Sequence, residues 1–295
     1  MVTGFDTALG EITLVLFTTL APSGVIALML MGVPVVRGGL PAQSSRRINQ
    51  CLWIPLVASM VGLVASATHL GNPANALYVF LGVGRSPLST EVFCAVVFLA
   101  LSGLYWLYTF VEHPLPALQR AWMALIMAAG VVFVTAVAFA YSADTIISWN
   151  TVYVPVNLWL NALVGGPVLA IVGLRAARYL PVEARYGRML ILVALVAFVA
   201  NTVSFVLQGG QLPLLENAFA TAADLVPGYG IMVALFAALV LAGIGADAWA
   251  LFGARKGLGN LHLVRASIAA ALVLGGIFIM RFAFYMMHMT VGLGV

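Results

Sequence analysis

The stretch 12-ITLVLFTTLAPSGVIALMLMGVPVV-36 contains no charged side chain and is long enough to cross a bilayer as a single helix. The whole chain resembles it in composition: 63% of its 295 residues are hydrophobic and only 7% are charged, whereas soluble domains carry about 25% charged residues. Lipid offers no hydrogen bonds to the backbone, so long apolar segments must be helical. The sequence therefore predicts an all-α membrane protein.

Seven further apolar segments follow the first one, so we expect eight transmembrane helices. They form a single integral membrane domain over residues 1–295, with possible halves at 1–145 and 146–295 that favour two four-helix bundles. The expected segments are Ile12–Val36, Cys51–His69, Glu91–Val111, Ala121–Tyr141, Tyr153–Leu174, Met189–Leu207, Tyr229–Leu251 and Ala266–His288.

Basic residues are divided unequally between the two sides of the membrane. Of the 13 lysines and arginines, Arg85 lies in an even-numbered connection and Arg281 lies inside the last segment. All the others follow segments one, three, five and seven: Arg37, Arg46, Arg47, Arg120, Arg175, Arg178, Arg185, Arg188, Arg255, Lys256 and Arg265. The positive-inside rule places these connections in the cytoplasm, which predicts periplasmic termini. Because topology accounts for the net charge of +4, the charge does not indicate a nucleic-acid partner.

His69 and Glu91 face each other across one outward connection, between the second and third segments. Imidazole titrates in the working pH range, and ionisable groups in membrane segments are candidates for function. Such a pair could hold a hydroxylated ring and take its protons, as quinol oxidation requires. The alternatives are a histidine that reaches headgroup water, and a glutamate that caps a helix N-terminus and is neutralised by Arg85.

Arg281, Tyr285 and His288 are spaced by four and three residues, so we expect them on one face of the last helix. A buried arginine needs a partner, for which a quinone pocket, a helix C-terminus or a carboxylate are candidates. The alternative is a structural pair that holds the last helix in place.

The sequence does not favour a metal site, a haem or an iron–sulfur cluster in this chain. His113 and His262 lie in the opposite connections, so only His69 and His288 share a membrane level. One haem at most is conceivable, and we expect none. The chain has 2 cysteines, whereas a Cys-ligated cluster needs about four.

Several motifs extend along the whole chain: His69-Leu-Gly-Asn-Pro73, Ala76, Val83-Gly84, Leu88-Ser89 and Glu91; Gly165-Gly166-Pro167; Gln208-Gly209; Leu225-Val226-Pro227-Gly228-Tyr229-Gly230; and Phe284-Tyr285-Met286-Met287-His288-Met289-Thr290-Val291-Gly292. Together they resemble the motifs of the DmsC anchor subunits of dimethyl sulfoxide reductase.

The resemblance implies a multi-pass, haem-free anchor in the bacterial inner membrane that oxidises menaquinol near its outward face. His69 and Glu91 match the quinol-site residues of that family, whereas Arg85 matches no fixed residue. Electrons would pass to a four-cluster iron–sulfur subunit carrying [4Fe-4S] clusters, docked on the periplasmic face. They would then reach a catalytic subunit with a molybdenum bis-pterin cofactor.

Other functions compete with this interpretation. Close relatives serve reductases of other N- or S-oxides or oxyanions, so the terminal substrate stays open. A purely structural anchor would leave all redox work to its partners. A secondary transporter would place its polar groups near the bilayer midplane, whereas the groups singled out here lie toward one face.

Overall fold

The computed structural model describes residues 4–68, 73–180, 184–252 and 259–289. Within these ranges the chain is helical, and eight spans are long and apolar enough to cross a membrane, as the sequence predicts. Short helices α1 (Gly4–Gly10), η1 (Pro73–Gly82), η2 (Leu212–Leu214) and α9 (Ala222–Leu225) lie between or before them. The spans are α2 (Ile12–Arg37), α3 with α4 (Ala42–Cys51 and Trp53–Thr68), α5 (Pro87–Tyr108), α6 (Pro116–Ala140), α7 (Tyr153–Ala176), α8 (Ala184–Gln211), α10 (Tyr229–Phe252) and α11 (Gly259–Met286).

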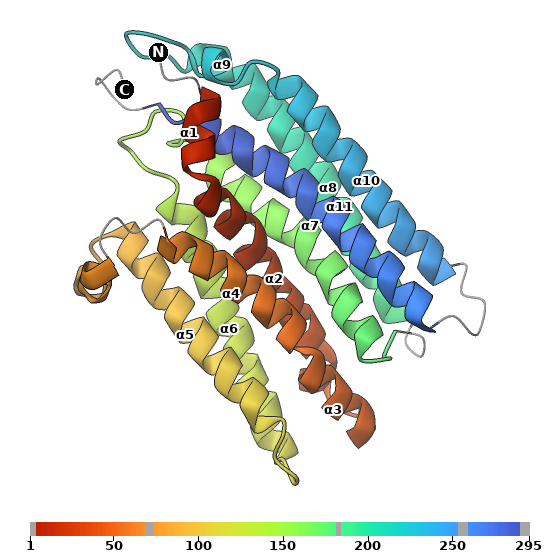
Figure 1. The fold of residues 1–295 in the computed structure, drawn as a ribbon. Coiled ribbons are helices and arrows are strands. Elements are labelled where there is room, and N and C mark those ends of the chain that lie inside the picture. Colours follow the sequence, from red (N-terminus) through yellow and green to blue (C-terminus); the bar gives the residue numbers. More distant parts are fainter. Residues whose placement is uncertain (1–3, 69–72, 181–183, 253–258, 290–295) are drawn as a thin grey trace.

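Helices α2 and α7 pack against each other and form the centre of the molecule (Figure 1). They are the most buried spans, whereas the others expose more of their surface. On one side α2 contacts α4 and α6, and α6 contacts α5. On the other side α7 contacts α8 and α11, while α10 packs against both of these helices. The centre therefore joins the two halves of the chain.

Glycines allow the central helices to approach closely, as small residues do in membrane proteins. A Cβ atom added at Gly166 of α7 would collide with Ile26 of α2, and one added at Gly165 would meet Ser23. Gly24 of α2 is equally crowded by Ser59 of α4. Gly165 and Gly166 thus allow close packing of α7 against α2.

We expect Gly166→Val to lower the thermal stability of the purified chain in detergent. The added side chain would overlap with atoms of α2. Overpacking of this kind lowers the free energy of unfolding by about 1–3 kcal/mol or more. Gly245→Val on α10 is the matched control, because a Cβ atom there meets nothing within 4 Å. An unfolding temperature equally unchanged in both variants would contradict the close α2–α7 contact.

Several helix ends differ from the expected segments, and two of these differences move a candidate site residue. Helix α5 begins at Pro87, because Ser86 caps it by accepting a hydrogen bond from the Ser89 backbone N–H at 3.4 Å. Glu91 therefore lies in the second turn, so the expectation that it caps the N-terminus in the first turn is wrong. Helix α11 ends at Met286, so His288 lies beyond the helix rather than on its face.

The described ends of the chain lie at the same end of the molecule (Figure 1). Phe5 of α1 packs on Phe282 of α11, with ring centres 5.3 Å apart. Helices α3 and α6, which carry Arg46 and Arg120 near their N-termini, begin at the opposite end, at the α2–α3 and α5–α6 connections (Figure 1). Among the basic residues, Arg255 and Lys256 lie outside the described residues.

Candidate functional site

Glu91 is buried, with 4% of its surface exposed, although it lies near the end of a membrane span. Its Oε2 atom has no hydrogen-bond partner. The nearby charged and phenolic groups that act on it electrostatically are Arg281, Tyr141 and Tyr285. A lone buried charge is costly, so the opposite charge of Arg281 explains how this carboxylate is accommodated.

Arg281 is buried even more deeply, with 2% of its surface exposed. Its Nε donates a hydrogen bond to Thr18 Oγ1 of α2 at 2.9 Å. The Thr18 hydroxyl donates its own hydrogen bond to the backbone carbonyl of Leu14 at 2.8 Å, so its oxygen is free to accept. The guanidinium carbon lies 4.1 Å from the ring centre of Phe284, a cation–π distance. Arg281 therefore ties α11 to α2.

Aromatic rings surround this pair. Tyr141, which follows α6 directly, lies edge-on to Tyr285 with 5.9 Å between ring centres. Trp149, from the α6–α7 connection, stacks on Phe284 at 4.5 Å and donates from its Nε1 to the Phe284 carbonyl at 3.2 Å. Rings from three separate elements thus enclose the buried charges.

We call Glu91, Arg281, Tyr141 and Tyr285 the Glu91–Arg281 cluster. Each member comes from α5, α11 or the end of α6. The Tyr285 hydroxyl lies close enough to Arg281, Tyr141 and Thr18 to interact with their polar groups, whereas Glu91 Oε2 has no hydrogen-bond partner. In the described part of the chain no direct ion pair joins the carboxylate to the guanidinium. The cluster therefore holds a carboxylate with an unused acceptor atom near a buried guanidinium and two phenols.

The other predicted site residues lie at different distances from this cluster. His288 is half-buried, and its ring meets Trp149 edge-on with 5.0 Å between centres. Burial lowers the pKa of His288 from its ordinary value, and the Glu11 carboxylate opposes that shift. Arg85 is exposed in the turn before α5 and does not join the buried group. His69 lies outside the described residues, directly after the end of α4.

A network of buried amides on the far side of Arg281 was missed by the sequence interpretation. Asn157 of α7 donates to the Gln208 side chain of α8 at 2.8 Å. One turn further along, Asn201 donates to Asn161 at 2.6 Å. Several amide atoms keep unused capacity, including Asn157 Oδ1 and Asn161 Nδ2. The sequence signal that could have revealed this network is the recurrence of polar residues at helical spacing inside apolar segments.

A cavity of about 10 Å³ connects this network with Arg281. Tyr229 of α10 also lines it, and its hydroxyl lies 3.4 Å from Gln208 Oε1. A space of this size holds about one water molecule, which needs polar partners of this kind. The amide network can therefore supply hydrogen bonds to Arg281 through a water molecule in this cavity.

A second buried carboxylate, Asp247, lies near the other end of α10 and interacts with the charge of Arg175. Asp247 is 18 residues from Tyr229, or roughly 27 Å along a helix at 1.5 Å per residue. It is therefore too remote to belong to the same site. Across the described residues, no group of three or more His, Cys, Asp or Glu side chains could hold a metal ion.

The Glu91–Arg281 cluster suits a small ring with hydroxyl or carbonyl oxygens at both ends. The carboxylate can accept a hydroxyl proton, and the guanidinium and phenol can donate to an oxygen. The surrounding aromatic rings offer an apolar wall for a planar molecule. Sequence interpretation found Glu91, Arg281 and Tyr285, but it missed Tyr141, Trp149 and Thr18, which only the fold brings to them.

Comparisons with known proteins agree with this architecture along nearly the whole chain. The family described as DMSO reductase anchor subunit (DmsC) matches residues 5–287. The protein is 30% identical over 286 residues to the C chain of the anaerobic dimethyl sulfoxide reductase of Escherichia coli (strain K12), covering 97% of each sequence. It is 32% identical over 285 residues to the YnfH chain of an anaerobic dimethyl sulfoxide reductase of that strain, again covering 97% of each sequence.

A third relative is the C chain of the anaerobic dimethyl sulfoxide reductase of Haemophilus influenzae. The two sequences are 30% identical over 292 residues, with 98% of this protein and 99% of the relative covered. The match thus includes every spanning helix and all four members of the Glu91–Arg281 cluster. The chain belongs to the DmsC family, the membrane anchor subunits of dimethyl sulfoxide reductase.

Proposed function

We propose that this chain oxidises menaquinol at the Glu91–Arg281 cluster and passes the electrons to an iron–sulfur subunit. The observation that carries the proposal is the burial of the Glu91 carboxylate, with its Oε2 atom unpartnered, near the buried Arg281 guanidinium and the Tyr285 hydroxyl. An acceptor and two donors, buried together among aromatic rings, match the hydroxyl and carbonyl oxygens of a quinol and its quinone.

Oxidation of menaquinol to menaquinone releases two electrons and two protons. In the proposed step one ring hydroxyl gives its proton to the Glu91 carboxylate, and the other gives its proton to neutral His69. The new carbonyl oxygens accept hydrogen bonds from Arg281 Nη2 or the Tyr285 hydroxyl. The two electrons leave to the nearest cluster of the partner subunit, and both protons leave on the same side of the membrane.

Orientation follows from the distribution of charge. The basic turns lie at the end of the molecule opposite the described chain ends (Figure 1), and basic connections remain in the cytoplasm. We therefore assign both termini and the quinol site to the periplasmic face of the bacterial inner membrane. On that face we place the iron–sulfur subunit, followed by the molybdenum catalytic subunit. Electrons and protons released on one side build no proton gradient by themselves.

Arg85 and His288 are assigned to the rim of the site. Arg85 is exposed in the turn before α5, and His288 touches Trp149 at the edge of the aromatic enclosure. The curated relatives are named for dimethyl sulfoxide, and we assign this chain to a reductase of that compound. A related N-oxide, S-oxide or oxyanion reductase is the alternative, because the terminal substrate meets only the catalytic subunit.

Reduction of the partner clusters by menaquinol tests the proposal. The purified complex, mixed with menaquinol under anaerobic conditions, should show reduced iron–sulfur signals by electron paramagnetic resonance. The two soluble subunits without this chain should be reduced by a dye such as reduced benzyl viologen but not by menaquinol. Equal menaquinol reduction with and without the chain would identify it as a purely structural anchor.

A further inference from the structure

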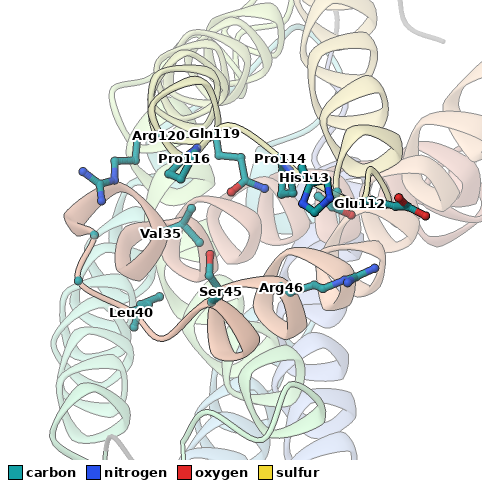
Figure 2. Close-up of a pocket in the computed structure, with 14 residues that line it drawn as sticks. Val35, Leu40, Ser45, Arg46, Glu112, His113, Pro114, Pro116, Gln119 and Arg120 are labelled. Atoms are coloured by element: carbon teal, nitrogen blue, oxygen red, sulfur yellow. The ribbon is translucent and has the colours of Figure 1, made fainter.

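A cavity of about 570 Å³ lies at the end of the molecule opposite the Glu91–Arg281 cluster. Two connections form it, the α2–α3 turn and the α5–α6 turn (Figure 2). Both connections follow or precede membrane spans, so the cavity lies where a leaflet has its head groups. No step of the proposed quinol chemistry uses this region.

Two arginines give the cavity its charge. Arg46 of α3 and Arg120 of α6 both line it, and both are exposed. Neither has a hydrogen-bond or ion-pair partner among the described residues. Glu112 also lines the cavity, but Figure 2 shows it and Arg120 at opposite ends. The Arg120 end therefore carries a positive charge with no carboxylate beside it.

The α2–α3 turn leaves room beside this charge. Gly38 and Gly39 have φ angles of 72° and 76°, a conformation that glycine adopts without strain. The Arg120 guanidinium lies against Gly38, where a Cβ atom would approach its Nη2 within 2.6 Å. A side chain at Gly38 would push the guanidinium away. The absence of a side chain at this position therefore allows Arg120 to stay at the cavity wall.

Two helix N-termini open into the same cavity. Helix α3 begins at Ala42 and helix α6 at Pro116, and both residues line it. Neither N-cap residue, Pro41 or Leu115, accepts a side-chain hydrogen bond from its helix. Pro116 has no N–H group and the Gln119 N–H is bonded to the Leu115 carbonyl, whereas the Ala42 N–H at the start of α3 is available to an anion, which helix N-termini favour.

Gln119 points independently to a ligand. Only 8% of its surface is exposed, and its side chain makes no hydrogen bond in the described ranges. Figure 2 shows its amide directed into the cavity, between the two connections. The amide is open to the cavity and is therefore free to donate to a ligand oxygen there.

We propose that this cavity binds the phosphate of an anionic phospholipid such as phosphatidylglycerol. Arg120, the N-terminus of α3 and the Gln119 amide are donors suited to phosphate oxygens. Arg46 adds a positive charge at the other end of the cavity (Figure 2). Apolar side chains beside the cavity are strongly exposed, including Phe110, Leu115 and Leu118. They provide a surface for the acyl chains, which a free phosphate ion does not have.

Lipid titration of the delipidated complex in detergent, followed by native mass spectrometry, tests the proposal. The probe is palmitoyl-oleoyl phosphatidylglycerol, with the matching phosphatidylcholine as reference. Each arginine near an anionic lipid contributes about 1 kcal/mol, so Arg46→Gln/Arg120→Gln should weaken phosphatidylglycerol binding about 30-fold. The control Arg47→Gln/Arg188→Gln changes net charge equally at exposed arginines that do not line the cavity, and should bind like wild type.

A second variant separates specific binding from general attraction to basic residues. Gln119→Leu keeps every charge, and we expect it to weaken phosphatidylglycerol binding several-fold with unchanged thermal stability in detergent. Equal affinity in the Arg46→Gln/Arg120→Gln variant and its control would overturn the proposal. So would displacement of the lipid by millimolar inorganic phosphate. Menaquinol-driven turnover of the cavity variants in detergent should equal wild type, so the two proposals fail separately.

Discussion

The His69→Arg variant is expected to assemble normally and to lose menaquinol-driven turnover by about 10²–10⁴-fold, the usual contribution of a general base. Arginine keeps a polar group at the membrane interface, but it is always protonated and cannot accept a quinol proton. The measurement is reduction of the terminal acceptor by the complex, driven either by menaquinol or by a soluble reduced dye. Dye-driven turnover should persist, because the dye feeds electrons directly to the partner subunits.

Glu91→Gln should also lower menaquinol-driven turnover while dye-driven turnover persists, and the loss should be smaller than in His69→Arg. Glutamine retains the shape and hydrogen-bonding capacity of the side chain but accepts no proton. Glu216→Gln is the matched control, since Glu216 is an exposed carboxylate outside the site. A stability defect would lower both assays together. Menaquinol turnover near wild type in His69→Arg would show that this histidine only reaches headgroup water.

Arg281→Gln should reduce the amount of assembled chain in the membrane and its unfolding temperature. Removing this buried arginine leaves polar groups that interact with it buried without compensation, which costs about 1–3 kcal/mol. Here Glu91 would lose Arg281, and Thr18 would lose the hydrogen bond at 2.9 Å. Quantified immunoblots of membranes, and thermal unfolding in detergent, measure the effect.

The double variant Glu91→Gln/Arg281→Gln distinguishes two causes of the lost stability: loss of the electrostatic interaction between Glu91 and Arg281, and loss of the arginine side chain itself. Removing both charges should recover part of the lost stability, with a coupling of about 0.5–3 kcal/mol, while menaquinol turnover stays low. Arg185→Gln, at an exposed arginine, controls for the change of residue type. Normal assembly and turnover in Arg281→Gln would contradict the proposed role of the cluster.

Local patterns in the sequence predicted the spanning helices well, because hydropathy is a property of each segment taken alone. The segment Tyr229–Leu251 matches α10 to within one residue. Helix ends were predicted less well where a cap decides them. Ser86 with Pro87 starts α5 earlier than the apolar pattern does, which moves Glu91 from the first turn to the second.

The candidate site was only partly predictable for a different reason. Glu91 and Arg281 are noticeable because charges are rare in this chain, but nothing near either one indicates the other. The proximity of the two residues depends on the packing of α5, α6 and α11 around α2. Tyr141 and Trp149 look like ordinary interfacial aromatic residues in sequence, and only long-range contacts such as Trp149 with Phe284 bring them to the site.

The separation of Glu91 and Arg281 along the chain has a consequence for biosynthesis. The ribosome delivers α5 to the membrane long before α11, so the carboxylate enters the bilayer while its counter-charge has not yet been translated. Nascent chains must tolerate an uncompensated acid until the last helix arrives and engages Thr18 of α2. Chains truncated before α11 would keep that acid exposed, which would mark incomplete products for membrane proteases.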